Sequence, residues 1–203
     1  MQNNTLLNLQ HEPDFAAIRV EDIQPAMQTA MAEARAQIAA IKQQPENAAN
    51  WLNTVEPLTD LTERVGRIWG VVAHLNSVVD TPELRAVYNE LMPEVTVFFT
   101  EIGQDIELYA RFKAIKQSPE FAQLSPAQQT KLAHDLRGFV LSGAELPPKQ
   151  QAELAALQTE AAQLSAQFSQ NVLDATDAFA LYFDDEGSLK GLPEDALAMF
   201  QAA

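Results

Sequence analysis

The chain has 203 residues, of which 28 are acidic and 13 are basic, so its formal net charge at pH 7 is -15. This charge argues against nucleic acid and against anionic membrane surfaces as partners, because both select basic proteins. The absence of cysteine excludes disulfides, thiolate nucleophiles and cysteine-based zinc sites. No signal-peptide pattern opens the chain and no apolar run is long enough to span a membrane, so we expect a cytoplasmic protein.

Apolar residues recur at steps of three and four along most of the chain, which predicts a bundle of long helices. The first predicted helix starts near Glu21, and its apolar stripe consists of Ile23, Met27, Met31, Ala34, Ile38 and Ile41. A second helix follows from about residue 50 to residue 79. Pro57 lies inside it, and because proline has no N–H to donate to the Asn53 carbonyl, we expect a bend there.

Prolines and capping residues predict where the next helices begin. A third helix is expected from Pro82 either to near Asp105 or on through Ile115, with a kink at Pro93 and a weak point at Gly103 where it could break. Ser125 with Gln128 three residues later has the pattern of a capping box, which predicts the start of a fourth helix.

A fifth helix is predicted after Pro147-Pro148. Its apolar residues alternate three and four positions apart, close to a heptad seam. They are Leu154, Leu157, Ala161, Leu164, Phe168 and Val172. Between them stand mostly Gln, Glu, Ala and Ser, so we expect the apolar side of this helix to be buried and the other side to face solvent.

The pattern changes after Thr176. Residues 179–183 form a short apolar and aromatic run, which predicts a β-strand whose pairing partner lies beyond Ala203, because a lone strand cannot satisfy its backbone groups. The expected fold class is therefore all-α: a multi-helix bundle of long, kinked antiparallel helices with a short β-strand near the C-terminus. We expect a helical lobe in residues 1–177 and the truncated start of a strand-containing segment in residues 178–203.

The three histidines do not form a zinc-peptidase motif. That motif needs two histidines one helical turn apart with a glutamate beside the first. His11-Glu12 begins the pattern, but Phe15 stands where the second histidine should be, and neither His74 nor His134 has a histidine four residues away. We therefore expect no catalytic residue, metal site or cofactor in this chain itself.

Two polar residues of the second predicted helix are the candidate functional residues. His74 is interpreted either as a partly exposed histidine bonded to a neighbour or to water, or as a polar group on the wall of a substrate channel. Asn76, like Asn171, is a poor helix former in a long helix, and such residues often make hydrogen bonds between helices.

Five short motifs, in their order and spacing, resemble the N-terminal helical region of the thimet-oligopeptidase family of zinc metallopeptidases. They are Gly66-Arg67-Ile68-Trp69, His74-Leu75-Asn76-Ser77-Val78, Thr81-Pro82-Glu83-Leu84-Arg85, Leu141-Ser142-Gly143 with Leu146-Pro147, and Phe168 to Thr176. The resemblance implies the N-terminal lobe of a larger, clam-shaped helical peptidase. In that architecture two lobes flank a deep channel that admits only short, unstructured peptides.

The resemblance also implies that the full-length parent is a cytosolic metalloendopeptidase with zinc held by a His-Glu-x-x-His helix and a later glutamate. None of these ligands has a counterpart here, so we expect this chain alone to be inactive. Its expected contribution is part of the channel wall and a size filter, with His74 and Asn76 as candidate channel residues. The alternatives are a stand-alone helical module that binds a partner protein, and a purely structural bundle.

Overall fold

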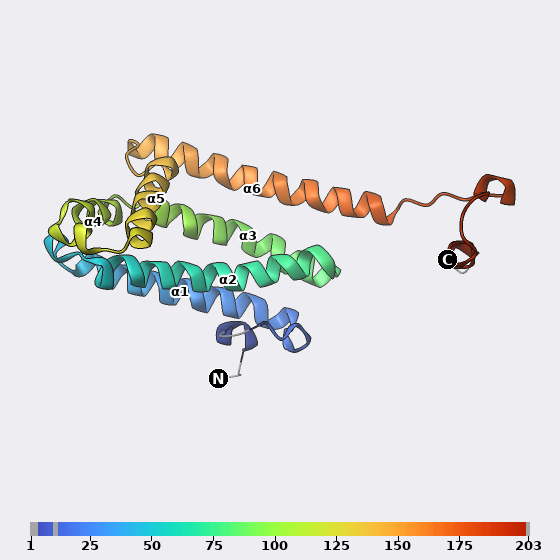
Figure 1. Ribbon diagram of the computed structural model, residues 1–203, viewed down its shortest axis with the longest axis horizontal. Helices are drawn as coiled ribbons and strands as arrows, with labels where there is room; N and C mark the ends of the chain where they lie inside the picture. The colour runs from blue at the N-terminus through green and yellow to red at the C-terminus, as the bar shows by residue number, and fades with distance from the viewer. Residues whose placement is uncertain (1–3, 10–11, 202–203) are drawn as a thin grey trace. The chain divides into compact units, whose positions relative to one another are not determined.

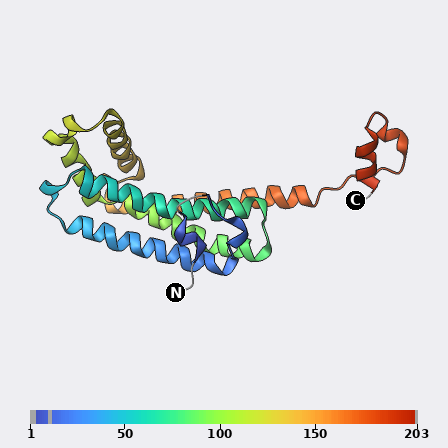
Figure 2. The same ribbon diagram turned by 60° about the horizontal axis from the view of Figure 1, so that its bottom comes forward.

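The computed structural model describes residues 4–9 and 12–201, and this part of the chain contains seven α-helices and no β-strand. Three long helices, α1 (Val20–Gln43), α2 (Glu56–Val78) and α3 (Pro82–Gly103), lie side by side, as Figure 1 and Figure 2 both show. The chain divides into two units, one up to Ser165 and one from Ala166 onwards. The described helices include none that could cross a membrane.

Side-chain contacts fix the directions of the long helices. Gln24 donates to Glu90 and Arg35 donates to Glu101, and both pairs are separated by 66 residues, so α1 and α3 run parallel. The short turn between α2 and α3 makes α2 antiparallel to both (Figure 1). The expected bundle of long antiparallel helices is therefore confirmed for these three elements.

The apolar stripe predicted for α1 is its buried side. All six predicted residues are buried, and they pack against Val65, Ile68 and Val72 of α2 and Phe98 of α3 in one continuous core. Full burial of an aliphatic side chain of this size contributes about 1.5–3 kcal/mol. The spacing of the stripe is thus the main reason why this segment forms an amphipathic helix at this place.

The irregularity expected at Pro57 takes another form. A π-helical turn, Trp51–Val55, precedes α2, and Pro57 is the second residue of the new helix. The turn continues directly into α2, with the Glu56 N–H bonded to the Trp51 carbonyl, so the change from π-helical to α-helical bonding coincides with the proline, which has no N–H to donate. Asn50 and Asn53 bond reciprocally in a capping box that starts the π-helical turn.

Two shorter helices, α4 (Ile106–Gln117) and α5 (Pro126–Ser142), pack at the end of the bundle where α1 ends and α2 begins (Figure 1). The α3 helix ends at Gly103, where a Cβ would lie 2.7 Å from the Cβ of Ser142. Both bonds of the predicted Ser125–Gln128 capping box are present, at 2.9 and 3.3 Å. Gly143 then ends α5 in the left-handed conformation, at φ 96°.

The α6 helix (Pro148–Asp177) starts where the sequence predicts, but the predicted burial of its apolar seam is wrong. Four seam residues are more than half exposed: Leu157, Leu164, Phe168 and Val172. The side of α6 that contacts α3 is polar instead, with Thr100 donating to Gln158 at 3.1 Å. Helical spacing identifies an apolar side, but it does not determine whether the neighbouring element covers that side.

The predicted β-strand at residues 179–183 is absent from the described structure. These residues have no regular secondary structure and are exposed, and they lead into a 3-10 turn (Glu186–Leu189) and the short helix α7 (Glu194–Gln201). A strand needs a second extended segment to complete its hydrogen bonds, and no such segment occurs in residues 4–9 or 12–201. The boundary expected at residue 177 stays a prediction.

Candidate functional site

The C-terminal end of α2 carries the first predicted site residue, His74. Its side chain is exposed, and its ring lies against the ring of Phe15 with 5.6 Å between the centroids. Phe15 belongs to a 3-10 turn (Phe15–Ala17) and is itself 45% exposed. The two rings therefore form a small aromatic surface that is open to solvent. No spacing rule connects residues 15 and 74, so the sequence offered no signal for this pair.

Asn76 is half-buried near His74 on α2, and its Oδ1 atom is buried without a hydrogen-bond partner in the described part of the chain. The interhelical bond expected from Asn76 is therefore not made by this oxygen. A buried acceptor left unpaired costs about 1–3 kcal/mol, so Oδ1 is an unused hydrogen-bonding site in the described structure.

An aromatic stack holds α2 to α3 beside these residues. The rings of Trp69 and Tyr88 lie 4.7 Å apart between centroids and 9° from parallel. Burial raises the pKa of the Tyr88 hydroxyl above its ordinary value, so that hydroxyl remains neutral throughout the physiological range. The stack is a rigid, uncharged support for the end of α2 that carries His74.

His134 lies elsewhere, on α5, at the edge of a groove of about 270 Å³ that is also lined by Thr62 and Phe99. Since an α-helix rises about 1.5 Å per residue, His74 is roughly 18 Å further along α2 than Thr62. The two histidines therefore cannot share an ion. The described residues contain no group of three His, Asp or Glu side chains able to hold a metal, and His11 lies outside them. The donor set that zinc requires is thus not assembled in the described part of the chain.

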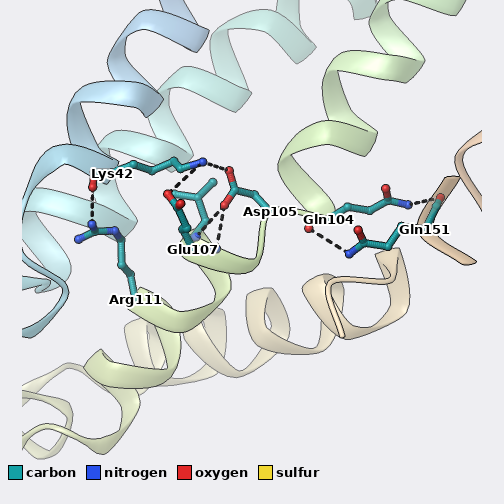
Figure 3. A network of polar contacts seen from close by, with 7 residues as sticks. Lys42, Gln104, Asp105, Glu107, Arg111 and Gln151 are labelled. Atoms are coloured by element: carbon teal, nitrogen blue, oxygen red, sulfur yellow. Dashed lines mark hydrogen bonds and ion pairs between the residues drawn. The ribbon is translucent and has the colours of Figure 1, made fainter. Parts of the chain in front are cut away.

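A polar cluster joins the end of α1 to the α3–α4 turn (Figure 3). Lys42 donates to Asp105 at 2.7 Å and pairs with Glu107 at 3.2 Å. The hydrogen bond from Lys42 to Asp105 is the largest cause of the raised pKa of this lysine. Asp105 also caps α4, since its Oδ1 accepts from the backbone N–H groups of Glu107 and Leu108.

Arg111 of α4 closes the other side of this cluster. Its guanidinium donates to the carbonyl oxygens of Lys42 at 2.6 Å and Gln44 at 2.5 Å, as Figure 3 shows for Lys42. These carbonyls belong to the C-terminus of α1, where a cation also interacts favourably with the helix dipole. The acidic cap at Asp105 could have been recognised from the sequence, because aspartate is one of the preferred N-cap residues and a glutamate follows in the first turn. The role of Arg111 had no such signal.

A pair of glutamines ties α3 to the start of α6 in the same region. Gln104 donates to the Gln151 carbonyl at 3.2 Å, and Gln151 donates to the Gly143 carbonyl at 3.0 Å. Figure 3 shows both glutamines beside the charged cluster. Because every carboxylate of this network is paired with a lysine or a backbone N–H, the network offers no free base. Its arrangement fits a structural clamp rather than a catalytic centre.

Comparison with known proteins assigns the chain to a family. The model of the neurolysin/thimet oligopeptidase N-terminal domain matches residues 27–151, which include most of α1, all of α2 to α5 and the start of α6. This chain belongs to the neurolysin/thimet oligopeptidase family. The His74 end of α2 and the whole charged clamp, which consists of Lys42, Asp105, Glu107 and Arg111, therefore lie within the family's N-terminal domain.

Individual oligopeptidases match almost the whole chain. It is 38% identical over 199 residues to oligopeptidase A of Haemophilus influenzae and 35% identical over 199 residues to oligopeptidase A of Escherichia coli. A probable cytosolic oligopeptidase A of Arabidopsis thaliana is 34% identical over 203 residues. These matches cover 98–100% of this chain, whereas the chain spans about 29% of the length of each relative.

Proposed function

We propose that this chain is the N-terminal, non-catalytic lobe of a cytoplasmic zinc oligopeptidase that hydrolyses short, unstructured peptides. The observation that carries the proposal is the match of nearly the whole chain to about 29% of several oligopeptidases A. The described residues hold no metal-binding group, so zinc and its ligands would belong to the rest of the enzyme. The name of the cytosolic Arabidopsis relative supports the compartment, although another Arabidopsis relative is named organellar.

Within this enzyme we assign the chain to part of the substrate-channel wall and to the size filter. The exposed His74–Phe15 ring pair could contact apolar side chains of a peptide, and an imidazole can also donate to or accept from a peptide backbone. The unpaired Oδ1 of Asn76 is an acceptor that a peptide N–H could satisfy after a local shift. The Trp69–Tyr88 stack holds the end of α2 that carries His74 against α3 and so keeps this wall rigid, which a filter for unstructured chains requires.

The first test compares hydrolysis of quenched fluorescent peptides by the 203-residue chain and by the product of its full reading frame. Each is assayed with and without a zinc chelator. We expect only the longer protein to cleave, and the chelator to abolish its cleavage. Chelator-sensitive cleavage by the 203-residue chain, with stoichiometric zinc, would contradict the proposal. If neither protein cleaves any peptide, the stand-alone interaction module becomes the better explanation.

The channel assignment has a separate test in the longer protein. We expect His74→Ala and Asn76→Ala to raise KM several-fold while kcat changes little, because both residues would bind substrate without touching the reacting bond. Ser77→Ala is the matched control, since the Ser77 hydroxyl is exposed and bonds back to the carbonyl of His74. Unchanged KM in both variants would remove these residues from the channel wall and leave the family assignment intact.

A further inference from the structure

The second unit of the chain has apolar side chains but no buried ones. Among the described side chains of residues 166–201, none is buried. Phe168, Phe179 and Tyr182 are 69%, 73% and 88% exposed. Six more large apolar residues of this unit are also exposed: Val172, Leu181, Phe183, Leu192, Met199 and Phe200. An exposed apolar surface of this extent marks an interaction site.

This unit cannot be a stable domain by itself. Segments below about 40 residues usually need disulfides, a metal or association with other protein in order to fold. The sequence has no cysteine, and the described residues have no metal-holding cluster. Association is the remaining means of covering these side chains.

The charge of the unit indicates what covers it. Residues 166–203 contain seven carboxylates and a single basic side chain, Lys190. A second copy of the same surface would bring like charges together, which opposes self-association. A surface with an apolar centre and Lys or Arg at its edge is complementary both to the exposed aromatics and to the acidic residues.

The comparisons indicate where such a surface is found. The family's N-terminal domain model stops at residue 151, within the first turn of α6, yet identity to the oligopeptidases covers 98–100% of the chain. The segment after residue 151 is therefore shared with oligopeptidases that are more than three times as long as this chain, because the chain spans about 29% of their length.

We propose that residues 166–201 are a docking segment, and that its exposed apolar side chains are covered by the polypeptide of the oligopeptidase that lies outside these 203 residues. The covering surface is apolar at its centre and basic at its edge. This inference rests on the proposed function, because it takes the chain to be one lobe of a longer enzyme. It adds the surface through which this lobe is held to the remainder.

Hydrogen exchange measured by mass spectrometry tests the proposal on the 203-residue chain and on the product of its full reading frame. We expect amides of residues 179–200 to exchange rapidly in the shorter chain and at least about 100-fold more slowly in the longer protein. Phe168→Gln should lower the Tm of the longer protein and leave that of the shorter chain unchanged. Gln167→Ala is the control, because this exposed neighbour lies about 100° away around the helix.

Each other outcome overturns the proposal. Slow exchange in a monomeric 203-residue chain would mean that residues 179–200 are protected without any further polypeptide. Rapid exchange in both proteins would mean that the rest of the longer protein does not cover them. Slow exchange that depends on concentration, with a dimer in sedimentation, would identify a second copy as the occupant. A reading frame that ends at residue 203 would leave no covering polypeptide in the same chain.

The same samples separate this inference from the proposed function. Peptide hydrolysis by the longer protein without slow exchange in residues 179–200 would overturn the docking segment alone. Slow exchange in a longer protein that hydrolyses no peptide would overturn the peptidase assignment alone. Raising the ionic strength should speed the exchange of residues 179–200 in the longer protein if basic residues surround the segment, because salt screens exposed charge pairs.

Discussion

Replacing Arg111 by methionine tests the clamp at the end of α1. Arg111 is only 5% exposed, and its guanidinium makes two hydrogen bonds to the carbonyls of Lys42 and Gln44. Methionine keeps most of the apolar stem and removes both bonds. Each bond from a charged donor contributes about 1.5–3 kcal/mol, so the gross loss is roughly 3–6 kcal/mol.

Part of that loss is offset by the removal of a buried charge. The Nε atom of Arg111 is buried and unpaired in the described structure, and a group of this kind costs about 1–3 kcal/mol. Subtracting this offset from the gross loss leaves roughly 0–5 kcal/mol, so the expected decrease in the free energy of unfolding for Arg111→Met is the central value of about 2–3 kcal/mol. For a unit of about 165 residues this corresponds to a Tm lower by roughly 5–10 °C.

The assay is urea unfolding followed by circular dichroism, with the slope m compared between variants. Arg111→Lys should recover only part of the loss, because one nitrogen, Nη2, donates to both carbonyls and the lysine ammonium ends one bond short of that position. Arg137→Met on the exposed side of α5 is the matched control and should stay within about 0.5 kcal/mol of the parent. A change below about 0.5 kcal/mol for Arg111→Met at unchanged m would refute the reasoning.

Three further expectations concern single side chains. Gly143→Ala should lower the free energy of unfolding by about 1–2 kcal/mol, because φ is 96° there and a Cβ would lie 3.0 Å from Leu146; thermal unfolding checks this. Leu132→Ala, at a fully buried site, should cost about 2–5 kcal/mol in urea unfolding, and a smaller loss would mean that the core collapses around it. Tyr109 donates to Glu145 at 2.7 Å, and this bond is the main cause of its raised pKa. The bond favours the protonated tyrosine, so below pH 10.0, the ordinary pKa of tyrosine, the free energy of unfolding of the parent should be about 0.5–1 kcal/mol higher than that of Tyr109→Phe. This difference should disappear as the pH rises through the raised pKa of Tyr109. A constant difference in unfolding free energy across the alkaline range would contradict that assignment.

Much of the bundle follows from local chemistry. The apolar stripe of α1 is buried at all six predicted positions, and the Ser125–Gln128 box starts α5 at the predicted residue. Prolines open α3, α5 and α6 as expected. These features depend on helix periodicity and on hydrogen bonds within a few residues, so they can be predicted without knowledge of the neighbours.

The candidate site could be predicted only in part. The sequence marked His74 and Asn76, and their assignment to a channel wall stays a prediction. The contact of His74 with Phe15 joins segments that no pattern relates. The unpaired state of the Asn76 oxygen depends on which donors the fold places nearby.

The sequence by itself determined the amphipathic character of α1, α2 and α3, the starts of α3, α5 and α6, the α1 side of the core and the absence of a zinc-peptidase motif from these 203 residues, because each depends on residue identity and on short-range spacing. Only the tertiary structure decided that the large apolar residues of α6 remain exposed while Gln158 faces α3, and that residues 179–183 stay unpaired. It also decided that Arg111 caps α1. The physical reason is the same in each case: burial and hydrogen-bond pairing join distant segments of the chain, and the periodic pattern of one segment does not show which other segment packs against it.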